Sequence, residues 1–381
     1  MQRYNHYKPT QLGIRQTQIQ VDSKQTQLKL IDENKGTIQV NGWGLNLDQQ
    51  LLVNYQYAAP LSLAVKQLNN LKFRSWNYFL IHTPTHVIQV IFVDLNLGIA
   101  CPSNLVVMER QDIKGTQKII ETMTCPTYNK ETVSIGEKTE LVADQWSGSV
   151  IRKEGSMYQF KVNSKAANFE MDLTFDYSEN PGQVWATPLT NDLRTYYATQ
   201  KKPVSVVGSY SYNNQRQQCK GGDCFMMIDI GRGHLNYGMA YFWVLIMAKL
   251  KDGRTIYINL CDGASSEFKT LDKANEDFII VDGKHYKLDV TEMDYYKDNY
   301  MGRKTIRTAV QSNDYKKIYK NRSCEFSFEP QGQLSQGVNA AVIAMNQVFT
   351  YGPFKGFCDL DGDRIEIDNV FGHVEQVYSR W

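Results

Sequence analysis

The sequence predicts an all-β protein with few short helices, and two observations lead to that prediction. Apolar and polar side chains alternate over strand lengths in many segments, such as residues 169–175 and 254–260. Asp-Gly dipeptides, which are typical of tight β-hairpins, separate such segments at Asp252-Gly253, Asp282-Gly283 and Asp361-Gly362. Many short antiparallel strands joined by hairpins indicate a sandwich or a barrel.

Composition limits the class of protein and its partners. The 381 residues are 42% hydrophobic and 22% charged, so the chain can bury a large core in two units. The formal net charge is +2, and Lys and Arg are scattered along the sequence. Because no basic stripe is available to neutralise phosphates, we expect no nucleic-acid binding. Aromatic residues make up 12% of the chain and lie mostly in the alternating segments.

Helical periodicity is confined to two segments. Residues 54–71 carry apolar side chains at a spacing of three to four, and residues 336–347 show a weaker form of this pattern. The most apolar run, residues 239–248, ends at Lys249 and is too short to span a bilayer. We therefore expect no transmembrane segment.

The chain divides into three predicted parts. Residues 1–35 form a polar, Gln-rich extension, residues 36–195 an N-terminal β-barrel and residues 196–381 a C-terminal β-barrel. The boundary falls in a proline-interrupted stretch without sustained alternation. A Trp-to-Asp hairpin of nearly equal length occurs in both halves, from Trp76 to Asp94 and from Trp243 to Asp262. This similarity suggests two copies of one unit.

Cysteine usage and the N-terminus bear on the compartment. The seven cysteines form an odd set without a Cys-x-x-Cys pair, which argues against a disulfide framework and favours a reducing, cytoplasmic location. Cys219 and Cys224 could close a loop disulfide, although two free thiols are the commoner outcome for such a spacing. Residues 1–30 contain a single acid, Asp22, so the alternatives are a polar extension and an organelle import signal.

A set of short motifs resembles a known family. In chain order they are Gly42-Trp43-Gly44, Arg74-Ser75-Trp76-Asn77-Tyr78, Asp229-Ile230-Gly231-Arg232-Gly233, Glu276-Asp277, Ile306-Arg307-Thr308, Gln347-Val348-Phe349 and the closing Glu375-x4-Arg380-Trp381. From about residue 40 to the end, the chain resembles the domain of unknown function 2804 family. The resemblance implies two lipocalin-like antiparallel β-barrel halves, similar in architecture to carotenoid hydratase-like proteins.

A polar cluster is the candidate ligand-binding site. Asp229 and Arg232 lie three residues apart and could form a buried ion pair or a pocket floor. Asp229 or Glu276, kept protonated by apolar surroundings, could donate a proton to a double bond. The structural alternative is a salt bridge that closes the barrel, and we favour it. The full candidate set is Asp229, Arg232, Tyr241, Trp243, Glu276 and Asp277.

Other motif residues are expected to be structural. Arg74 beside Trp76 resembles the Arg that lipocalin barrels stack against a Trp, and Glu375, Arg380 and Trp381 would lock the last strand. No cofactor is expected. Pro84 places His82 and His86 in a turn, which disfavours a metal site there.

Three functions are compatible with these observations. The first is binding of an apolar small molecule or lipid without catalysis, because a lipocalin-like barrel suits one small ligand. The second is a scaffold that binds protein partners through residues 1–35 and the long insertion at residues 47–72. The third is a hydratase, cyclase or isomerase acting on an isoprenoid or lipid, with Asp229 or Glu276 as the acid.

Overall fold

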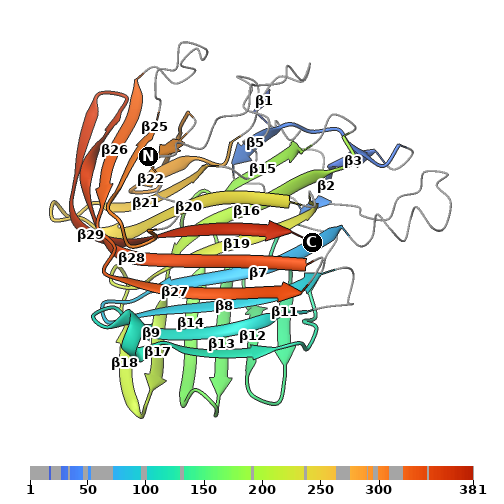
Figure 1. Ribbon diagram of the computed structural model, residues 1–381, viewed down its shortest axis with the longest axis vertical. Coiled ribbons are helices and arrows are strands. Elements are labelled where there is room, and N and C mark those ends of the chain that lie inside the picture. The colour runs from blue at the N-terminus through green and yellow to red at the C-terminus, as the bar shows by residue number, and fades with distance from the viewer. Residues whose placement is uncertain are drawn as a thin grey trace. The chain divides into compact units, whose positions relative to one another are not determined.

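The computed structural model describes residues 17–18, 27–32, 35–45, 50–52, 72–95, 101–128, 133–189, 193–235, 238–262, 275–289, 291–294, 299–308, 321–340 and 343–380 (Figure 1). Nearly all regular structure in these ranges is strand, and α2 (Ile113–Thr116) is the only helix that they contain. The predicted all-β class is confirmed. The chain separates into two compact units, consisting mainly of residues 18–236 and 237–381 and called here the N-terminal and C-terminal units.

The N-terminal unit contains one large and one medium sheet. In spatial order, the nine-stranded sheet consists of β1 (Thr17–Gln18), β5 (Gly42–Leu45), β15 (Gln183–Pro188), β16 (Tyr196–Ser205), β19 (Phe225–His234), β7 (Phe73–His82), β8 (His86–Leu95), β9 (Ser103–Glu109) and β10 (Lys118–Thr122). The six-stranded sheet consists of β11 (Lys138–Val142), β12 (Ser147–Arg152), β13 (Met157–Ser164), β14 (Phe169–Asp176), β17 (Val207–Tyr212) and β18 (Gln215–Cys219). Two small pairs complete it: β2 (Gln27–Lys29) with β6 (Gln50–Leu52), and β3 (Ile31–Asp32) with β4 (Thr37–Ile38).

The core of the N-terminal unit is filled by aromatic side chains from both sheets. Phe79 of β7 packs 4.8 Å from Phe160 of β13, and Phe92 of β8 stacks on Trp146 at 5.9 Å, measured between ring centroids. Because successive strand residues point to opposite faces, β7 places Phe79 in this core and Trp76 on the other face. This second face of the nine-stranded sheet carries the candidate site.

The C-terminal unit is built on one long sheet. Its order is β23 (Lys284–Lys287), β22 (Phe278–Val281), β21 (Thr255–Asp262), β20 (Gly238–Lys249), β29 (Asp363–Arg380), β28 (Ile343–Leu360), β26 (Arg322–Phe328), β25 (Lys304–Thr308) and β24 (Thr291–Met293), and β27 (Gly332–Ala340) pairs with β28. The terminal strand β24 also contacts β21, so the sheet curls back on itself as in a barrel. A separate apolar core lies inside this unit.

The predicted Asp-Gly turns are present. Asp282 and Gly283 have φ values of 46° and 78°, and they connect β22 to β23. Asp361 and Gly362, with φ values of 56° and 98°, connect β28 to β29. Both dipeptides adopt the left-handed conformation that two-residue hairpins require.

The two Trp-containing hairpins also agree with the sequence. In β7–β8, Ser75 pairs with Asp94. In β20–β21, Phe242 pairs with Asp262. The acid therefore faces the residue before the Trp in both hairpins, which supports the equivalence of the two segments.

Two expectations differ from the structure, and a third falls on residues that it does not describe. The helix expected at residues 336–347 is wrong: these residues belong to the hairpin β27–β28, in which Gln336 pairs with Gln347. The helix expected at residues 54–71 lies outside the described residues. The contact boundary falls near residue 236, whereas the predicted domains meet at residue 195. β16 begins at residue 196 but pairs with β15 and β19 in the first sheet.

The expected absence of disulfides is also wrong. Cys101 is bonded to Cys125, and Cys324 is bonded to Cys358 on the neighbouring strands β26 and β28. The spacing of the cysteines in the sequence did not predict these bonds, because the bonded partners are 24 and 34 residues apart and only the fold brings them together. Cys219, Cys224 and Cys261 are free thiols.

Candidate functional site

The two charged residues of the Asp-x-Gly-Arg-Gly element lie on opposite faces of β19. Residues three apart in a strand point in opposite directions, so the expected Asp229–Arg232 ion pair is wrong. Arg232 lies on the core face with Ile230, and Asp229 lies on the other face. Each of these two charged side chains contacts other residues on its own face of the sheet.

Arg232 is fully buried and bound mainly by neutral acceptors. Its Nη1 donates to the carbonyl oxygens of Trp76 at 2.5 Å and Gly231 at 2.6 Å, and its Nη2 donates to Asn77 Oδ1 at 2.7 Å. The guanidinium also lies 4.8 Å from the centre of the Tyr128 ring. Burial lowers the pKa of Arg232 to about 10 and raises that of Tyr128 to about 12. Arg232 is therefore a buried cation whose hydrogen bonds link β19 to β7 inside the unit.

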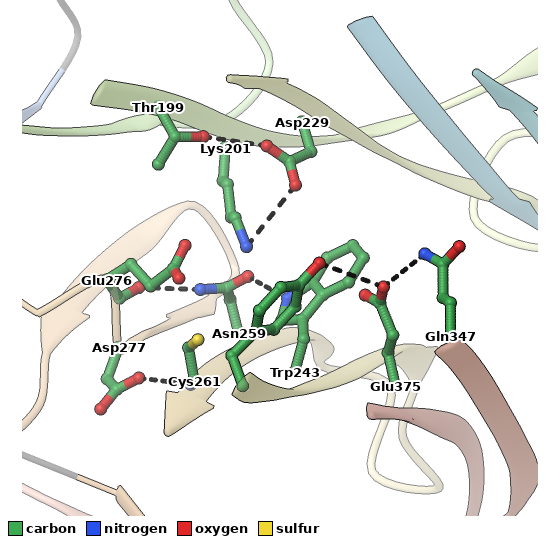
Figure 2. A network of polar contacts seen from close by, with 11 residues as sticks. Thr199, Lys201, Asp229, Trp243, Asn259, Cys261, Glu276, Asp277, Gln347 and Glu375 are labelled. Carbon is green, nitrogen blue, oxygen red and sulfur yellow. Dashed lines mark hydrogen bonds and ion pairs between the residues drawn. The ribbon is translucent and has the colours of Figure 1, made fainter. Parts of the chain in front are cut away.

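Asp229 contacts a cation on the second face (Figure 2). Its Oδ1 accepts a hydrogen bond from Thr199 Oγ1 at 2.9 Å, and its Oδ2 lies 3.6 Å from Lys201 Nζ. Thr199 and Lys201 are on β16, and Lys201 sits directly opposite Asp229 in the strand register. All three side chains are buried. The pair thus brings one donor and one acceptor group to the same point on this face.

Aromatic side chains lie beside this ion pair. Five residues are paired side by side across neighbouring strands: Trp43, Trp185, Thr199, Gly231 and Trp76. Thr199 and Gly231 in this row are two residues away from Lys201 and Asp229, respectively, and so lie on the same face. A Cβ atom at Gly231 would meet the Trp76 ring at 2.1 Å, so this ring lies directly over the glycine. Trp76 is half-buried and stacks on Tyr197 at 5.6 Å, and Trp185 contacts Tyr197 edge-on at 5.2 Å. The three rings form an aromatic cluster, defined here as Trp76, Trp185 and Tyr197.

The C-terminal unit holds a separate polar group on β20 and its neighbours (Figure 2). Trp243 Nε1 donates to Asn259 Oδ1 at 2.7 Å, and Asn259 Nδ2 donates to the backbone oxygen of Glu276 at 2.8 Å. Glu375 Oε1 accepts hydrogen bonds from Gln347 Nε2 at 2.6 Å and from Tyr241 at 3.3 Å. These contacts tie β20, β21, β28 and β29 together.

Asp277 closes the curled sheet of the same unit. Its carboxylate accepts from the backbone N–H of Cys261 at 2.6 Å, and from the N–H and hydroxyl of Thr291 at 3.1 Å each. Cys261 is on β21 and Thr291 is on β24, so one carboxylate bridges the two strands where the sheet curls back. Asp277 is completely buried, and desolvation raises its pKa to about 7. The contacts of Asp277 are those of a structural residue.

Lys287 lies next to Asp277. Its Nζ donates to Asn275 Oδ1 and to the backbone oxygens of Asp277 at 2.7 Å and Leu288 at 3.3 Å. Burial lowers the pKa of Lys287 to about 7, and the nearby Asp277 opposes that shift.

The residues expected to be structural have mixed outcomes. Arg74 is buried and donates to the Phe73 carbonyl oxygen at 2.8 Å, and its stacking on a Trp remains a prediction. Glu375 has the contacts given above. Arg380 ends β29, and Trp381 lies outside the described residues. Residues 1–35 and 47–72, the expected partner segments, are mostly outside them as well.

Sequence reasoning missed Lys201, Asn77 and Lys287. Lys201 belongs to no motif. It lies two residues from both Thr199 and Pro203, so strand alternation could have placed it on the same face as Thr199. Asn77 stands inside the Arg74–Tyr78 motif, where we considered only Arg74 and Trp76. Lys287 follows a hairpin turn and is indistinguishable in sequence from a solvated lysine.

An open groove with both polar and apolar lining lies on the six-stranded sheet. Its volume is about 710 Å³, and its lining includes Glu140, Lys161, Glu170, Asp172, Ser209 and Arg216. Lys161 and Asp172 form an ion pair at 3.4 Å, with about half of each side chain exposed. Such exposed pairs are typical of a solvated sheet face.

Neither a metal site nor a membrane-spanning helix occurs in the described ranges. Among those residues, no three His, Cys, Asp or Glu side chains are grouped in a way that could hold a metal ion. A search of the same ranges finds no helix with the length and apolar character to cross a membrane.

The chain is similar to two solved structures. The crystal structure of CghA with Sch210972 is 9% identical with a TM-score of 0.49, and the similarity covers 81% of this chain and 88% of that one. Kievitone hydratase from Nectria haematococca is 14% identical with a TM-score of 0.47, covering 86% and 95%. No curated protein sequence matches the chain.

The family comparison is more decisive. The model of one family, described as "Domain of unknown function (DUF2804)", matches residues 18–381. This range contains every motif on which the resemblance was based, so the predicted family is confirmed. The chain belongs to the family of the domain of unknown function DUF2804.

Proposed function

We propose that the chain binds an apolar small molecule or lipid that carries one polar group, on the second face of the nine-stranded sheet. The observation that carries this proposal is the aromatic cluster over Gly231, one step along the sheet from the buried Lys201–Asp229 pair. Ligand sites commonly combine apolar walls with a few fixed polar groups, and this face supplies both.

The aromatic cluster suits the apolar part of a ligand. Trp76 is the half-buried member, whereas Trp185 and Tyr197 behind it are almost fully buried. A ring held on two sides keeps its orientation, so little side-chain entropy is lost when a ligand stacks on it. The small side chain of Thr199 and the bare Gly231 lie between Trp185 and Trp76 in the row.

The ion pair suits the polar part of the ligand. Lys201 can donate to a carbonyl or carboxylate oxygen, and Asp229 can accept from a hydroxyl group. Thr199 donates to Asp229 and fixes its orientation. Both carboxylate oxygens of Asp229 already have partners, and this favours binding over proton donation by Asp229.

Native mass spectrometry of the purified full chain tests the proposal. We expect a bound apolar molecule in about equal amount to the protein, released by organic solvent, or uptake of the probe cis-parinaric acid when the protein is empty. The K201M variant should bind the carboxylate probe about tenfold more weakly, whereas K161A, on the exposed face of the other sheet, should match the wild type. A protein that is empty and does not take up the probe would contradict the proposal.

A further inference from the structure

The two free thiols of the N-terminal unit flank one tight turn. Cys219 ends β18 and Cys224 precedes β19, with residues 220–223 between them. The Asp223 N–H donates to the Lys220 carbonyl oxygen at 3.1 Å and closes this turn. The two cysteines lie opposite residues that are only two apart on the neighbouring segment. Cys219 pairs with Gly208, and the Cys224 carbonyl oxygen accepts a hydrogen bond from the Val206 N–H at 3.0 Å.

Both cysteine side chains are buried in the same apolar cluster. Cys219 and Cys224 are 3% and 0% exposed and belong to one apolar cluster that also includes Tyr210. The neighbouring Cys224 thiol, followed by burial, raises the pKa of the Cys219 thiol.

We propose that Cys219 and Cys224 are a reversible modification site, at which the two thiols are oxidised to a disulfide by a small-molecule or protein disulfide. The bond would join the edge strand β18 of the six-stranded sheet to β19 of the nine-stranded sheet. With Cys101–Cys125 and Cys324–Cys358 already formed, six of the seven cysteines would be paired and Cys261 would remain free.

The chemistry is thiol–disulfide exchange. One cysteine, as its thiolate, attacks a sulfur of glutathione disulfide, forms a mixed disulfide and expels one glutathione thiolate. The second cysteine then attacks the protein sulfur of the mixed disulfide and expels the other glutathione. The protein thiols lose two electrons and two protons, and the two glutathione molecules gain them. Because the raised thiol pKa leaves little thiolate, we expect this exchange to be slow in the folded protein.

Peptide mapping of the full chain tests this proposal. The folded protein is incubated with glutathione disulfide, first in buffer and then in urea below the unfolding midpoint, which allows the exposed turn to open. Remaining thiols are blocked with N-ethylmaleimide in denaturant, and the protein is cleaved with trypsin, which cuts after Lys220. We expect a linked pair of peptides containing Cys219 and Cys224, about 2 Da lighter than the sum of their reduced forms, with label on Cys261 alone.

Two variants and two internal references make the result decisive. C261S should give the same linked peptides with no label, and C224S should leave Cys219 as a free thiol or a glutathione adduct. The intact Cys101–Cys125 and Cys324–Cys358 bonds show that the buffer is oxidising. Label on both Cys219 and Cys224 in both incubations, or a bond from either one to Cys261, would overturn the proposal.

Discussion

The two units each bury a positive charge, but in different surroundings. Arg232 of the N-terminal unit is bound by two backbone carbonyls and Asn77, and burial leaves its pKa at about 10. Lys287 of the C-terminal unit lies beside the Asp277 carboxyl group, and burial lowers its pKa to about 7. The planar guanidinium spreads its charge and reaches several acceptors at once, whereas the ammonium is a compact charge that loses its proton more readily when buried. The N-terminal unit therefore holds a fixed charge, and the C-terminal unit holds one that burial opposes more strongly.

Removing Arg232 should have the largest effect. R232M leaves the Trp76 and Gly231 carbonyls and the Asn77 amide without their donor, and we expect a loss of about 3–5 kcal/mol in the free energy of unfolding. R232K keeps the positive charge but lacks the several N–H donors of the guanidinium, and it should lower the free energy of unfolding by less than R232M does. Urea unfolding followed by circular dichroism measures the unfolding free energy of both variants. An unchanged midpoint for R232M would contradict a stabilising role for the buried Arg232.

Removing Lys287 should cost less. K287M removes the donor to Asn275 and to two backbone oxygens, but it also removes a charge that burial opposes, so we expect a loss of about 1–3 kcal/mol. The same unfolding experiment compares the two units directly. A K287M cost equal to that of R232M would remove the difference between them.

A histidine near Lys287 should make the C-terminal unit sensitive to acid. Burial, with the charges of Lys287 and Arg322, lowers the pKa of His285 to about 3, whereas an unfolded His titrates near 6.5. Between these values the unfolded state binds the extra proton, so stability falls as the pH decreases from 6.5 towards 3. From pH 7 to pH 4.5 we expect wild type to lose about 1–3 kcal/mol more than H285Q. Parallel slopes for the two proteins would refute this assignment.

The smallest effect is expected on the exposed groove. Lys161 and Asp172 are both about half exposed, and K161A should change the unfolding free energy by less than about 0.5 kcal/mol. Its unfolding midpoint provides the baseline for the buried variants. A loss above about 1 kcal/mol would indicate that this face is not simply solvated.

The local features of the fold could be predicted from the sequence, because strands and turns are encoded by neighbouring residues. Two-residue alternation predicted β14 and β21, and Asp-Gly dipeptides predicted the turns of β22–β23 and β28–β29. The weak helical pattern at residues 336–347 failed because pairing with β28 decides the structure there. The Asp229–Arg232 ion pair considered from the sequence failed because residues three apart on a strand lie on opposite faces, and strand periodicity could have excluded it.

The site depends on pairings that are distant in sequence. Lys201 lies opposite Asp229 only because β16 pairs with β19, and Trp76 lies over Gly231 only because β7 pairs with β19. Both disulfides result from the same kind of contact. A single sequence carries no record of register between distant strands, so only some residues of the site could be named, and they could not be assembled.

A titration with cis-parinaric acid on two matched Trp variants tests the central claim most directly. Trp76 and Trp243 occupy equivalent hairpins in the two units. From the sequence, Trp243 was a ligand-binding candidate and Trp76 was expected to be structural. We predict that W76F binds the probe about tenfold more weakly than wild type and that W243F binds it normally, with folding of both checked by circular dichroism. Normal binding by W76F with weakened binding by W243F would place the ligand on the C-terminal unit and contradict the account.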